Sequence, residues 1–423
     1  MVREVKGAAG RAGVSRHLLI LINKLDCGGT QRFTATLSEG LVARGWRVTV
    51  ACLAAEHEAF MPLPCAVERR LLAVSGDSAN LAEALWNNFR RMTTIRGMVK
   101  ELAPDAVLAT SATLSILAGM ATVGIREVRK VGAERGHPPT TLPAPFWTAL
   151  RKRAYALLDA VTCLTPEAAA WVAANTNARR TVAIPNAVPW PFPVNQPVMA
   201  PVDVLPLHRK LVLGAGRLVE VKGFELLIRA FSKLATMHGE WDLVIVGEGP
   251  RRGELEALVA AEGLCGRVHL PGLVGNIGEW YRRADLFVLS SLSEGFANVL
   301  SEALAHGVAA VAFDCDDGPR HIVRHGIDGL LVPANDEVAL ADALARVMGD
   351  NGLRERLAAR AREARERFHP DPLCGAWEKL FMGSAVLPEG REPFTAAVRA
   401  GPIAKLATSP GSNTSDKRTR RVE

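Results

Sequence analysis

The strongest constraint on the fold comes from residues 285–319, where a strand, a glycine-containing loop, a helix and a second strand follow one another. Asp285 to Leu289 is a short apolar run of the length expected for a buried parallel strand. A serine-rich turn with Glu294-Gly295 leads into a helical segment from about Ala297 to His306, and Gly307 stands where a helix C-cap belongs. VAAVAF then starts the second strand. This order predicts a βαβ unit whose loop opens at the carboxyl end of a parallel sheet, where ligands bind in open α/β folds.

The start of this helix predicts a site for a diphosphate. The first N–H groups of a helix are unpaired and its dipole is positive there, and Gly295 lets the backbone approach a ligand closely. Glu294 on the loop and Glu302 on the helix can accept hydrogen bonds from sugar hydroxyls, as acidic residues do in dinucleotide folds. A single Glu is more often a solvated residue, so the prediction depends on the combination.

This stretch resembles the retaining glycosyltransferases of family 4, whose hallmark is a Glu, seven residues and a second Glu. Here the hallmark reads EGFANVLSE, and the continuation FDCDDGPRHIVRHGIDGLLVP is similar to the bacterial polysaccharide and lipid-linked oligosaccharide assembly branch. The resemblance runs from Leu18 to Leu380 and implies the α/β fold called GT-B, in which two doubly wound Rossmann-like domains face each other across a cleft. The donor-binding residues that it implies here are Glu294, Gly295, Phe296, Ala297, Asn298, Val299 and Glu302. Glu294 is then expected to hold sugar hydroxyls, and Glu302 the ribose.

Length and composition agree with two soluble domains. The 423 residues exceed the roughly 250–300 at which a single hydrophobic core stops growing. No run approaches the ~20 apolar residues of a membrane-spanning helix, and the basic start lacks the apolar segment of a signal peptide. The seven cysteines form no CxxC pair, which argues against a disulfide framework or structural zinc and fits a reducing cytoplasm.

The net charge of +7 indicates anionic partners: nucleotide diphosphates, anionic membranes or nucleic acid. Nucleic acid is not expected, because aromatic residues make up only 5% and do not interleave with basic ones. The basic amphipathic segment from Leu81 to Leu102 and the cluster Arg151-Lys152-Arg153 are either solvated faces or contacts to anionic lipid headgroups. A cytoplasmic protein is expected, with the inner face of the cytoplasmic membrane as a candidate peripheral location.

The Pro-rich stretch WPFPVNQPVMAPVDVLPL, which has neither helical nor strand periodicity, is interpreted as an interdomain linker. Beyond Gly383 the chain has the composition of a disordered segment. The predicted organisation is an acceptor-side domain (17–189), the linker (190–207), a nucleotide-sugar-binding domain (208–371), a helix that packs back on the first domain (372–383) and a disordered tail (384–423).

Two loops of the first domain are candidates for the site. Gly28-Gly29 follows the strand HLLILIN; a glycine pair alone is more often a tight turn. It resembles the N-terminal glycine loop of family 4, commonly followed by a basic residue, as Arg32 is here, and this implies that it borders the donor phosphate and the acceptor. The run ERGHP resembles the "ERN-P" loop of this branch, which implies that His137 lies near the reacting centre; a solvated loop histidine is the alternative.

In the second domain, the strand LVLGAG ends in a G-x-G turn, but Val219 stands where a dinucleotide fingerprint needs its third glycine. Arg217 and Lys222, five apart on this loop, can converge on one anion, as a diphosphate leaving group requires. In family 4 the similar "GRL---KG" loop, with Gly216 here, supplies the Arg and Lys that bind the donor diphosphate. Two exposed basic loop residues are the alternative.

The resemblance also places the segment after the "PG" turn, with Leu273, Val274 and Ile277, against the nucleotide base. The cluster Asp314-Cys315-Asp316-Asp317 is similar to a metal-binding DxD motif of an unrelated glycosyltransferase fold. Because two cations and a helix N-terminus already neutralise a diphosphate, we interpret the cluster as a strand-end loop and expect neither a metal nor another cofactor. No base that could activate Cys315 is evident.

The expected reaction is transfer of a hexose or N-acetylhexosamine from a nucleotide diphosphate sugar, expected to be a UDP-sugar, to a sugar hydroxyl of a lipid-linked or polysaccharide acceptor. Arg217, Lys222, Glu294 and His137 form the expected catalytic set, in which the two cations stabilise the departing diphosphate. No covalent nucleophile is evident, in keeping with the front-face mechanism proposed for retaining members.

Two alternatives stay open. A GT-B-fold UDP-GlcNAc 2-epimerase would release free sugar, but it needs a different set of carboxylates and histidine. A non-catalytic nucleotide- or glycan-binding protein would keep the fold without the chemistry. A dinucleotide oxidoreductase is disfavoured by the missing third glycine. The base, the sugar, the acceptor with its linkage and the oligomeric state are not specified by the sequence.

Overall fold

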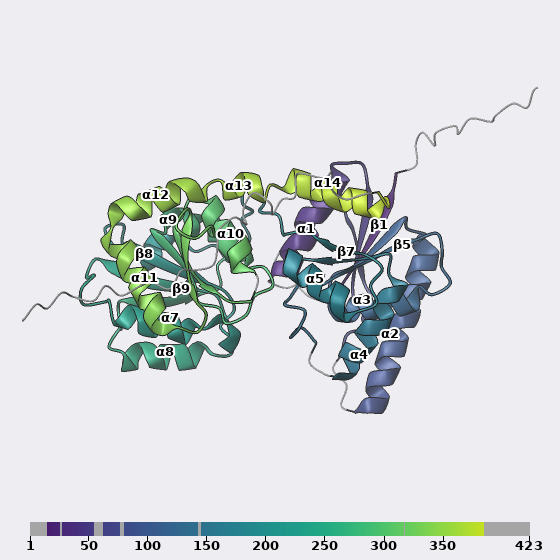
Figure 1. Ribbon diagram of the computed structural model, residues 1–423, viewed down its shortest axis with the longest axis horizontal. Coiled ribbons are helices and arrows are strands. Elements are labelled where there is room, and N and C mark those ends of the chain that lie inside the picture. Colours follow the sequence, from purple (N-terminus) through teal and green to yellow (C-terminus); the bar gives the residue numbers. More distant parts are fainter. Residues whose placement is uncertain are drawn as a thin grey trace, which may run out of the picture.

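The computed structural model describes residues 15–25, 28–54, 62–76, 80–142, 145–316 and 318–384. Two lobes lie side by side, each with a sheet between helices (Figure 1). The first contains β1 (His17–Ile22), α1 (Gly29–Val42), β2 (Arg47–Cys52), β3 (Glu68–Leu71), α2 (Leu81–Leu102), β4 (Ala106–Ala109), α3 (Ala112–Ala121), β5 (Arg129–Ala133), α4 (Pro145–Ala154), η1 (Tyr155–Leu157), β6 (Ala160–Cys163), α5 (Pro166–Asn175) and β7 (Thr181–Ala183).

The second lobe and the helices that follow it make up the rest of the described chain. These elements are α6 (Pro201–Val204), β8 (Lys210–Ala215), η2 (Glu220–Lys222), α7 (Phe224–Ser232), β9 (Trp241–Val246), α8 (Arg252–Ala261), β10 (Val268–Gly272), α9 (Ile277–Arg283), β11 (Leu286–Leu289), α10 (Asn298–Ala305), β12 (Ala310–Asp314), η3 (Pro319–His321), β13 (Gly329–Pro333), α11 (Glu337–Gly349), α12 (Asn351–Ala361), α13 (Ala364–Arg367) and α14 (Pro370–Phe381). In the described residues, no helix is long and apolar enough to cross a membrane.

Both sheets are parallel and doubly wound. The strand orders are β3-β2-β1-β4-β5-β6-β7 and β10-β9-β8-β11-β12-β13, and every strand pair runs parallel, as between β1 and β4 and between β8 and β11. The order reverses beside β1 in the first sheet and beside β8 in the second, and a crevice at the carboxyl ends of such strands is where α/β folds bind ligands. The predicted fold class of two doubly wound α/β domains is confirmed.

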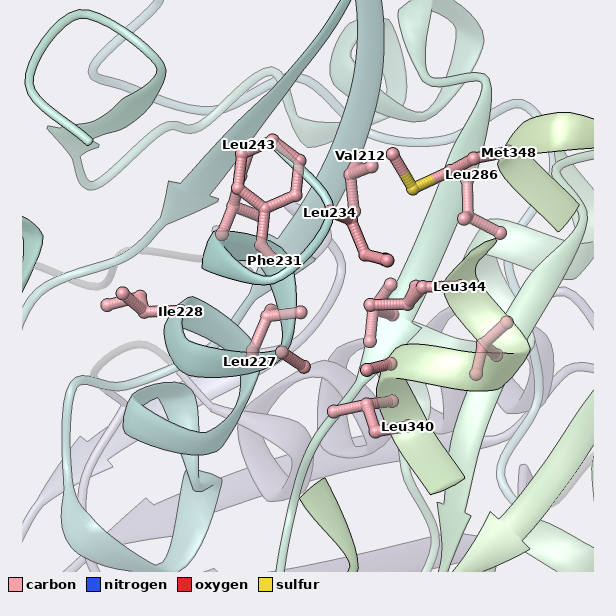
Figure 2. Packing of buried hydrophobic residues seen from close by; sticks show 14 of the residues in the cluster. Val212, Leu227, Ile228, Phe231, Leu234, Leu243, Leu286, Leu340, Leu344 and Met348 are labelled. Carbon is pink, nitrogen blue, oxygen red and sulfur yellow. The ribbon is translucent and has the colours of Figure 1, made fainter. Parts of the chain in front are cut away.

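The core of the second domain shows why the helices lie where they do. Leu227 and Phe231 on α7, and Leu340 and Leu344 on α11, are four residues apart and therefore share one face of their helix. All four are completely buried against sheet residues such as Val212 (Figure 2). Each such side chain contributes about 1.5–3 kcal/mol by leaving water.

The last helices join the two domains, running from the second across to the first (Figure 1). The ring centroids of Trp377 on α14 and Phe33 on α1 lie 5.3 Å apart, and both side chains belong to the core of the first domain. The charged pattern of residues 353–368 predicts one helix that ends at HPDP, whereas the structure has two helices, α12 and α13, with Leu353 and Leu357 buried. HPDP starts α14, because His369 accepts from the N–H of Asp371 through Nδ1 and Pro370 occupies the first turn.

The linker is partly helical and is hydrogen-bonded to the second domain. It contains α6, which the sequence pattern did not predict. The Asn195 N–H donates to the Gly275 carbonyl at 2.9 Å, and the Gly275 N–H donates to the Pro197 carbonyl at 2.6 Å. The middle of the linker is therefore hydrogen-bonded to the second domain. Apart from Ser384, the predicted disordered tail lies outside the described residues.

Candidate active site

A cleft of about 530 Å³ lies between the two domains at the carboxyl ends of their strands. Of the described residues that line it, six come from the first domain, among them Gly28 and Gly29 after β1, and two come from the linker. The structure brings together most of the residues that the sequence analysis selected. The selected residues that line the cleft are Gly28, Gly29, Gly216, Arg217, Lys222, Leu273, Glu294, Gly295, Phe296, Ala297, Asn298 and Val299. Glu302 and His137 do not line it.

The cationic part of the cleft is formed by the loop after β8. Arg217 is exposed to the cleft, whereas the ammonium of Lys222 donates to Oε1 of Glu294 at 2.5 Å. Ser291 donates to the same carboxylate oxygen at 2.8 Å. Gly223, with φ 57°, has no room for a side chain because a Cβ would lie 2.3 Å from the Ser290 carbonyl oxygen. This close packing holds Lys222 against Glu294 at the base of the cleft.

The loop from Glu294 to Ala297 leads directly into α10. The N-cap residue of this helix, Ala297, has no side chain that could cap it, and the first turn holds no acidic residue. N–H groups at such a start are ready donors for an anion. Residues 294–299 line the cleft together with Arg217 and Lys222. Two cations and a helix N-terminus therefore face the same cleft.

The two domains touch each other at this same loop. The Gly295 and Gly136 backbones are so close that a Cβ on Gly295 would lie 2.8 Å from the Cα and carbonyl carbon of Gly136. Beside this contact, Asn186 donates through Nδ2 to Oδ1 of Asn298 at 2.7 Å and accepts from Arg135 at 2.6 Å. The sequence patterns gave no role to Asn186, which follows β7, or to Arg135, which stands in the ERGHP run after β5.

A buried carboxylate anchors the loop that carries His137. Glu134, fully buried, accepts from the Tyr155 hydroxyl at 2.5 Å and from Nη1 of Arg151 at 3.2 Å, and burial raises the pKa of its carboxyl. Arg151 also donates to the Pro138 carbonyl at 2.9 Å. The expectation that the whole 151–153 cluster is a solvated or lipid-contacting face is therefore wrong for Arg151, because only Lys152 and Arg153 are exposed.

His137 lies beside the aspartate cluster. Its Nε2 is 3.6 Å from Oδ1 of Asp316, whose other oxygen accepts from the Ser293 hydroxyl and, at 3.1 Å, from the Glu294 N–H. Asp314 pairs with Arg320 at 3.0 Å. Burial raises the pKa of the Cys315 thiol to about 12. His137 thus contacts the loop of Glu294 through Asp316; Asp317 lies outside the described residues.

Glu302 lies below the cleft, one turn of α10 after Asn298. Its side chain is 2% exposed, and it forms an ion pair with Arg32 of the first domain. The other oxygen accepts from the Tyr281 hydroxyl at 3.0 Å, and burial raises the pKa of Tyr281 well above its usual value. The family resemblance implied that Glu302 holds the donor ribose; in the structure its carboxylate accepts from Arg32 and Tyr281, and the side chain does not line the cleft.

An apolar part of the cleft wall is shared with the linker. Leu273, Val274 and Ile277, the three residues predicted for the base, all line it. Phe192 and Asn195 of the linker lie in the same wall, where the linker is hydrogen-bonded to Gly275. An apolar wall with a few polar groups is suited to a flat heterocycle.

Comparisons with known proteins divide the chain at the same linker. The family model described as Glycosyltransferase Family 4 matches residues 27–189, and that of Glycosyl transferases group 1 matches residues 199–364. The exopolysaccharide phosphotransferase of Streptomyces coelicolor is 35% identical over 74% of this chain, and the match spans 32% of that protein. The lipopolysaccharide core biosynthesis glycosyltransferase LpsD of Rhizobium meliloti is 34% identical over 54% of this chain and 64% of its own length. The chain thus spans less than two thirds of either relative.

Solved structures share the fold at low sequence identity. Sucrose-phosphate synthase of Thermosynechococcus elongatus has a TM-score of 0.73 at 19% identity, with 87% of this chain and 98% of that chain covered. HepE of Anabaena, solved in complex with UDP and glucose, has a TM-score of 0.68 at 19% identity, covering 86% and 99%. These neighbours support the two-domain GT-B arrangement.

Proposed function

Because this chain belongs to the family 4 glycosyltransferases of the GT-B fold, we propose that it transfers a hexose or N-acetylhexosamine from a UDP-sugar to a sugar hydroxyl, with retention of anomeric configuration. The observation that carries this proposal is that Arg217, Lys222 and the N-terminus of α10 line one cleft between the domains. Complexes of HepE and of TarM with UDP support a uridine nucleotide as the donor.

The donor diphosphate is proposed to lie between the two cations and the first N–H groups of α10. Lys222 has three N–H donors; one is directed at Glu294, and the others can serve phosphate oxygens. Arg217 can bind phosphate oxygens with two parallel N–H groups. Placed where charge builds up on the leaving group, such donors lower the barrier, and removing one costs about 10²–10³ in kcat at comparable sites.

Glu294 is proposed to hold the hydroxyls of the transferred sugar. Its carboxylate is fixed by Lys222 and Ser291, which suits hydrogen bonding better than attack on the anomeric carbon. We therefore propose that the acceptor hydroxyl attacks the anomeric carbon on the same face of the sugar ring from which the diphosphate departs. The bond from the anomeric carbon to the diphosphate breaks, the acceptor oxygen bonds to that carbon, and the acceptor proton passes to the departing diphosphate. His137, through Asp316, is proposed to hold the Glu294 loop. No metal is needed in this scheme.

The acceptor is proposed to be a lipid-linked or polysaccharide sugar at the cytoplasmic membrane face. Relatives include a glycosyltransferase of lipopolysaccharide core synthesis and a 4-α-N-acetylgalactosaminyltransferase from Campylobacter jejuni, whose name contains a diphospho-undecaprenol acceptor. On α2, Trp86 and Phe89 are 64% and 54% exposed, and Arg90 beside them is exposed. Exposed aromatic residues next to basic ones favour the interface of an anionic bilayer.

Vesicle sedimentation tests this location. The full chain is expected to sediment with phosphatidylglycerol vesicles and less with neutral phosphatidylcholine vesicles, and Trp86→Ser with Phe89→Ser should abolish the difference. Exposed Met237→Ser on the other domain serves as the matched control. Equal sedimentation of wild type and the double variant would contradict the peripheral location without affecting the transfer reaction.

Thermal stabilisation by nucleotides tests the donor site. UDP at about 100 times its dissociation constant should add roughly 2.7 kcal/mol, whereas Arg217→Ala should lose most of this stabilisation. Arg229→Ala, an exposed arginine of α7 in the same domain, should keep it. Stabilisation by NADH alone, or by no nucleotide, would refute the transferase assignment. UDP binding with release of free epimerised sugar in the absence of acceptor would favour the epimerase, and binding without turnover a non-catalytic protein.

A further inference from the structure

The ion pair between Arg32 and Glu302 crosses from one domain to the other. Arg32 belongs to α1 of the first domain, and its Nη1 donates to Oε1 of Glu302 on α10 of the second. The side chains are 17% and 2% exposed, so the pair is largely removed from water. Removing one partner of such a pair leaves an uncompensated buried charge.

Three parts of the chain meet at this pair. The Tyr281 hydroxyl donates to the second carboxylate oxygen of Glu302 at 3.0 Å. The Arg32 guanidinium lies over the ring of Phe192 from the linker, 5.1 Å from its centroid, and Phe192 in turn packs edge-to-face on Tyr281 at 6.2 Å. The first domain, the linker and the second domain therefore orient one carboxylate together.

The same pair connects the two loops that flank the donor cleft. The Arg32 N–H donates to the Gly28 carbonyl at 3.1 Å, so the side chain starts from the first turn of α1 beside the glycine loop. Glu302 lies four residues after Asn298 and therefore on the same face of α10. Both Gly28 and Asn298 line the cleft. A change at the ion pair is thus transmitted to both walls of the donor site.

We propose that Arg32 is a positioning residue that crosses between the domains and, through Glu302, holds α10 in the orientation in which its N-terminus receives the donor nucleotide. Because Arg32 comes from the opposite domain, nucleotide binding and domain closure stabilise each other, and the coupling is reciprocal. This inference rests on the proposed function.

A double-mutant cycle on nucleotide affinity tests the proposal. The dissociation constant of UDP is measured by calorimetry for the full wild-type chain, Arg32→Met, Glu302→Gln and the double variant. Each single variant is expected to weaken binding by about 10-fold, within the range of ordinary coupling energies, and the double variant by little more than either single one. Independent effects, which would multiply to about 100-fold, would overturn the proposal.

Two further variants separate positioning from folding. Arg32→Lys keeps the charge and is expected to restore part of the affinity. Arg44→Met is the matched control: Arg44 follows the same helix but pairs with Asp371 of α14, away from the cleft, so UDP affinity should be unchanged. If Arg32→Met alone unfolds, two other variants still test the proposal through their UDP affinity. These are the double variant, which carries no uncompensated charge, and Arg32→Lys.

Donor turnover gives a readout that a purely structural role would not change. In Arg32→Met the kcat for UDP-sugar hydrolysis is expected to fall by about 10²-fold, the effect of a misplaced site group, with a smaller rise in KM. Wild type that binds no nucleoside diphosphate would refute the proposed function. Wild type that binds UDP, together with Arg32→Met that binds within twofold of it, would refute only the role of Arg32.

Discussion

Gly295→Ala is the substitution whose effect follows most directly from the contact between the two domains. The added Cβ would lie 2.8 Å from the Cα and carbonyl carbon of Gly136 and 3.1 Å from its oxygen. Gly295 does not have a left-handed φ, so alanine fits its own backbone conformation. The three nearest atoms to the added Cβ all belong to Gly136 of the other domain, so the closest contacts cross the domain interface. Because the atoms it meets are backbone atoms, no side chain can rotate away.

The cleft has to open for this methyl group. Ordinary contact begins at 3.4 Å, so the loops must separate by at least about 0.6 Å, given the steep repulsion below carbon–carbon contact. The donor diphosphate would stay with Arg217 and Lys222, both in the second domain, while the acceptor-side loops move away. A misplacement of this size costs up to about 10²-fold in rate, or about 2.7 kcal/mol in the activation free energy.

The assay is steady-state sugar transfer or donor hydrolysis, together with UDP affinity and thermal unfolding. We expect kcat to fall by about 10²-fold, while UDP affinity changes by less than about threefold, because the long Arg32 side chain can follow a small opening. The melting temperature should be nearly unchanged, since neither core is altered. Gly97→Ala in α2, where a Cβ meets nothing within 4 Å, is the matched control. A kcat of Gly295→Ala within twofold of wild type would refute the reasoning.

Three other substitutions test buried side chains that stabilise the fold around the site. Tyr155→Phe removes a hydrogen bond to buried Glu134 and should lower the free energy of unfolding by about 1–3 kcal/mol in urea titrations. Trp377→Ala should cost about 3–5 kcal/mol and detach α14, which protease sensitivity of the C-terminal helices would reveal. Burial lowers the pKa of His306 below its usual 6.5, so the unfolded chain binds the proton more readily and stability falls as pH drops below about 6.5. His306→Gln should reduce this loss in melts at pH 7.5 and 5.5; an unchanged pH dependence would contradict it.

Local patterns predicted many of the individual strands and helices, whereas the doubly wound GT-B arrangement was implied by the family resemblance. The basic amphipathic segment from Leu81 to Leu102 has the bounds of α2, and the stretch after Asp285 forms β11, α10 and β12 as expected. Such elements follow from apolar spacing and from glycines and caps, which act within a few residues. The charged segment that ends near Phe368 was less predictable, because its division into α12 and α13 depends on packing against the rest of the second domain.

The sequence by itself also determined which residues stand on one loop: Arg217 with Lys222, and Glu294 with the start of α10. Only the tertiary structure decided which of them meet. Lys222 pairs with Glu294, 72 residues away, and Arg32 with Glu302, 270 residues away. Likewise, the structure buries Arg151 while leaving Lys152 and Arg153 exposed. Local propensity depends only on residues that are close in sequence, whereas burial and charge pairing depend on the surfaces that folding brings together.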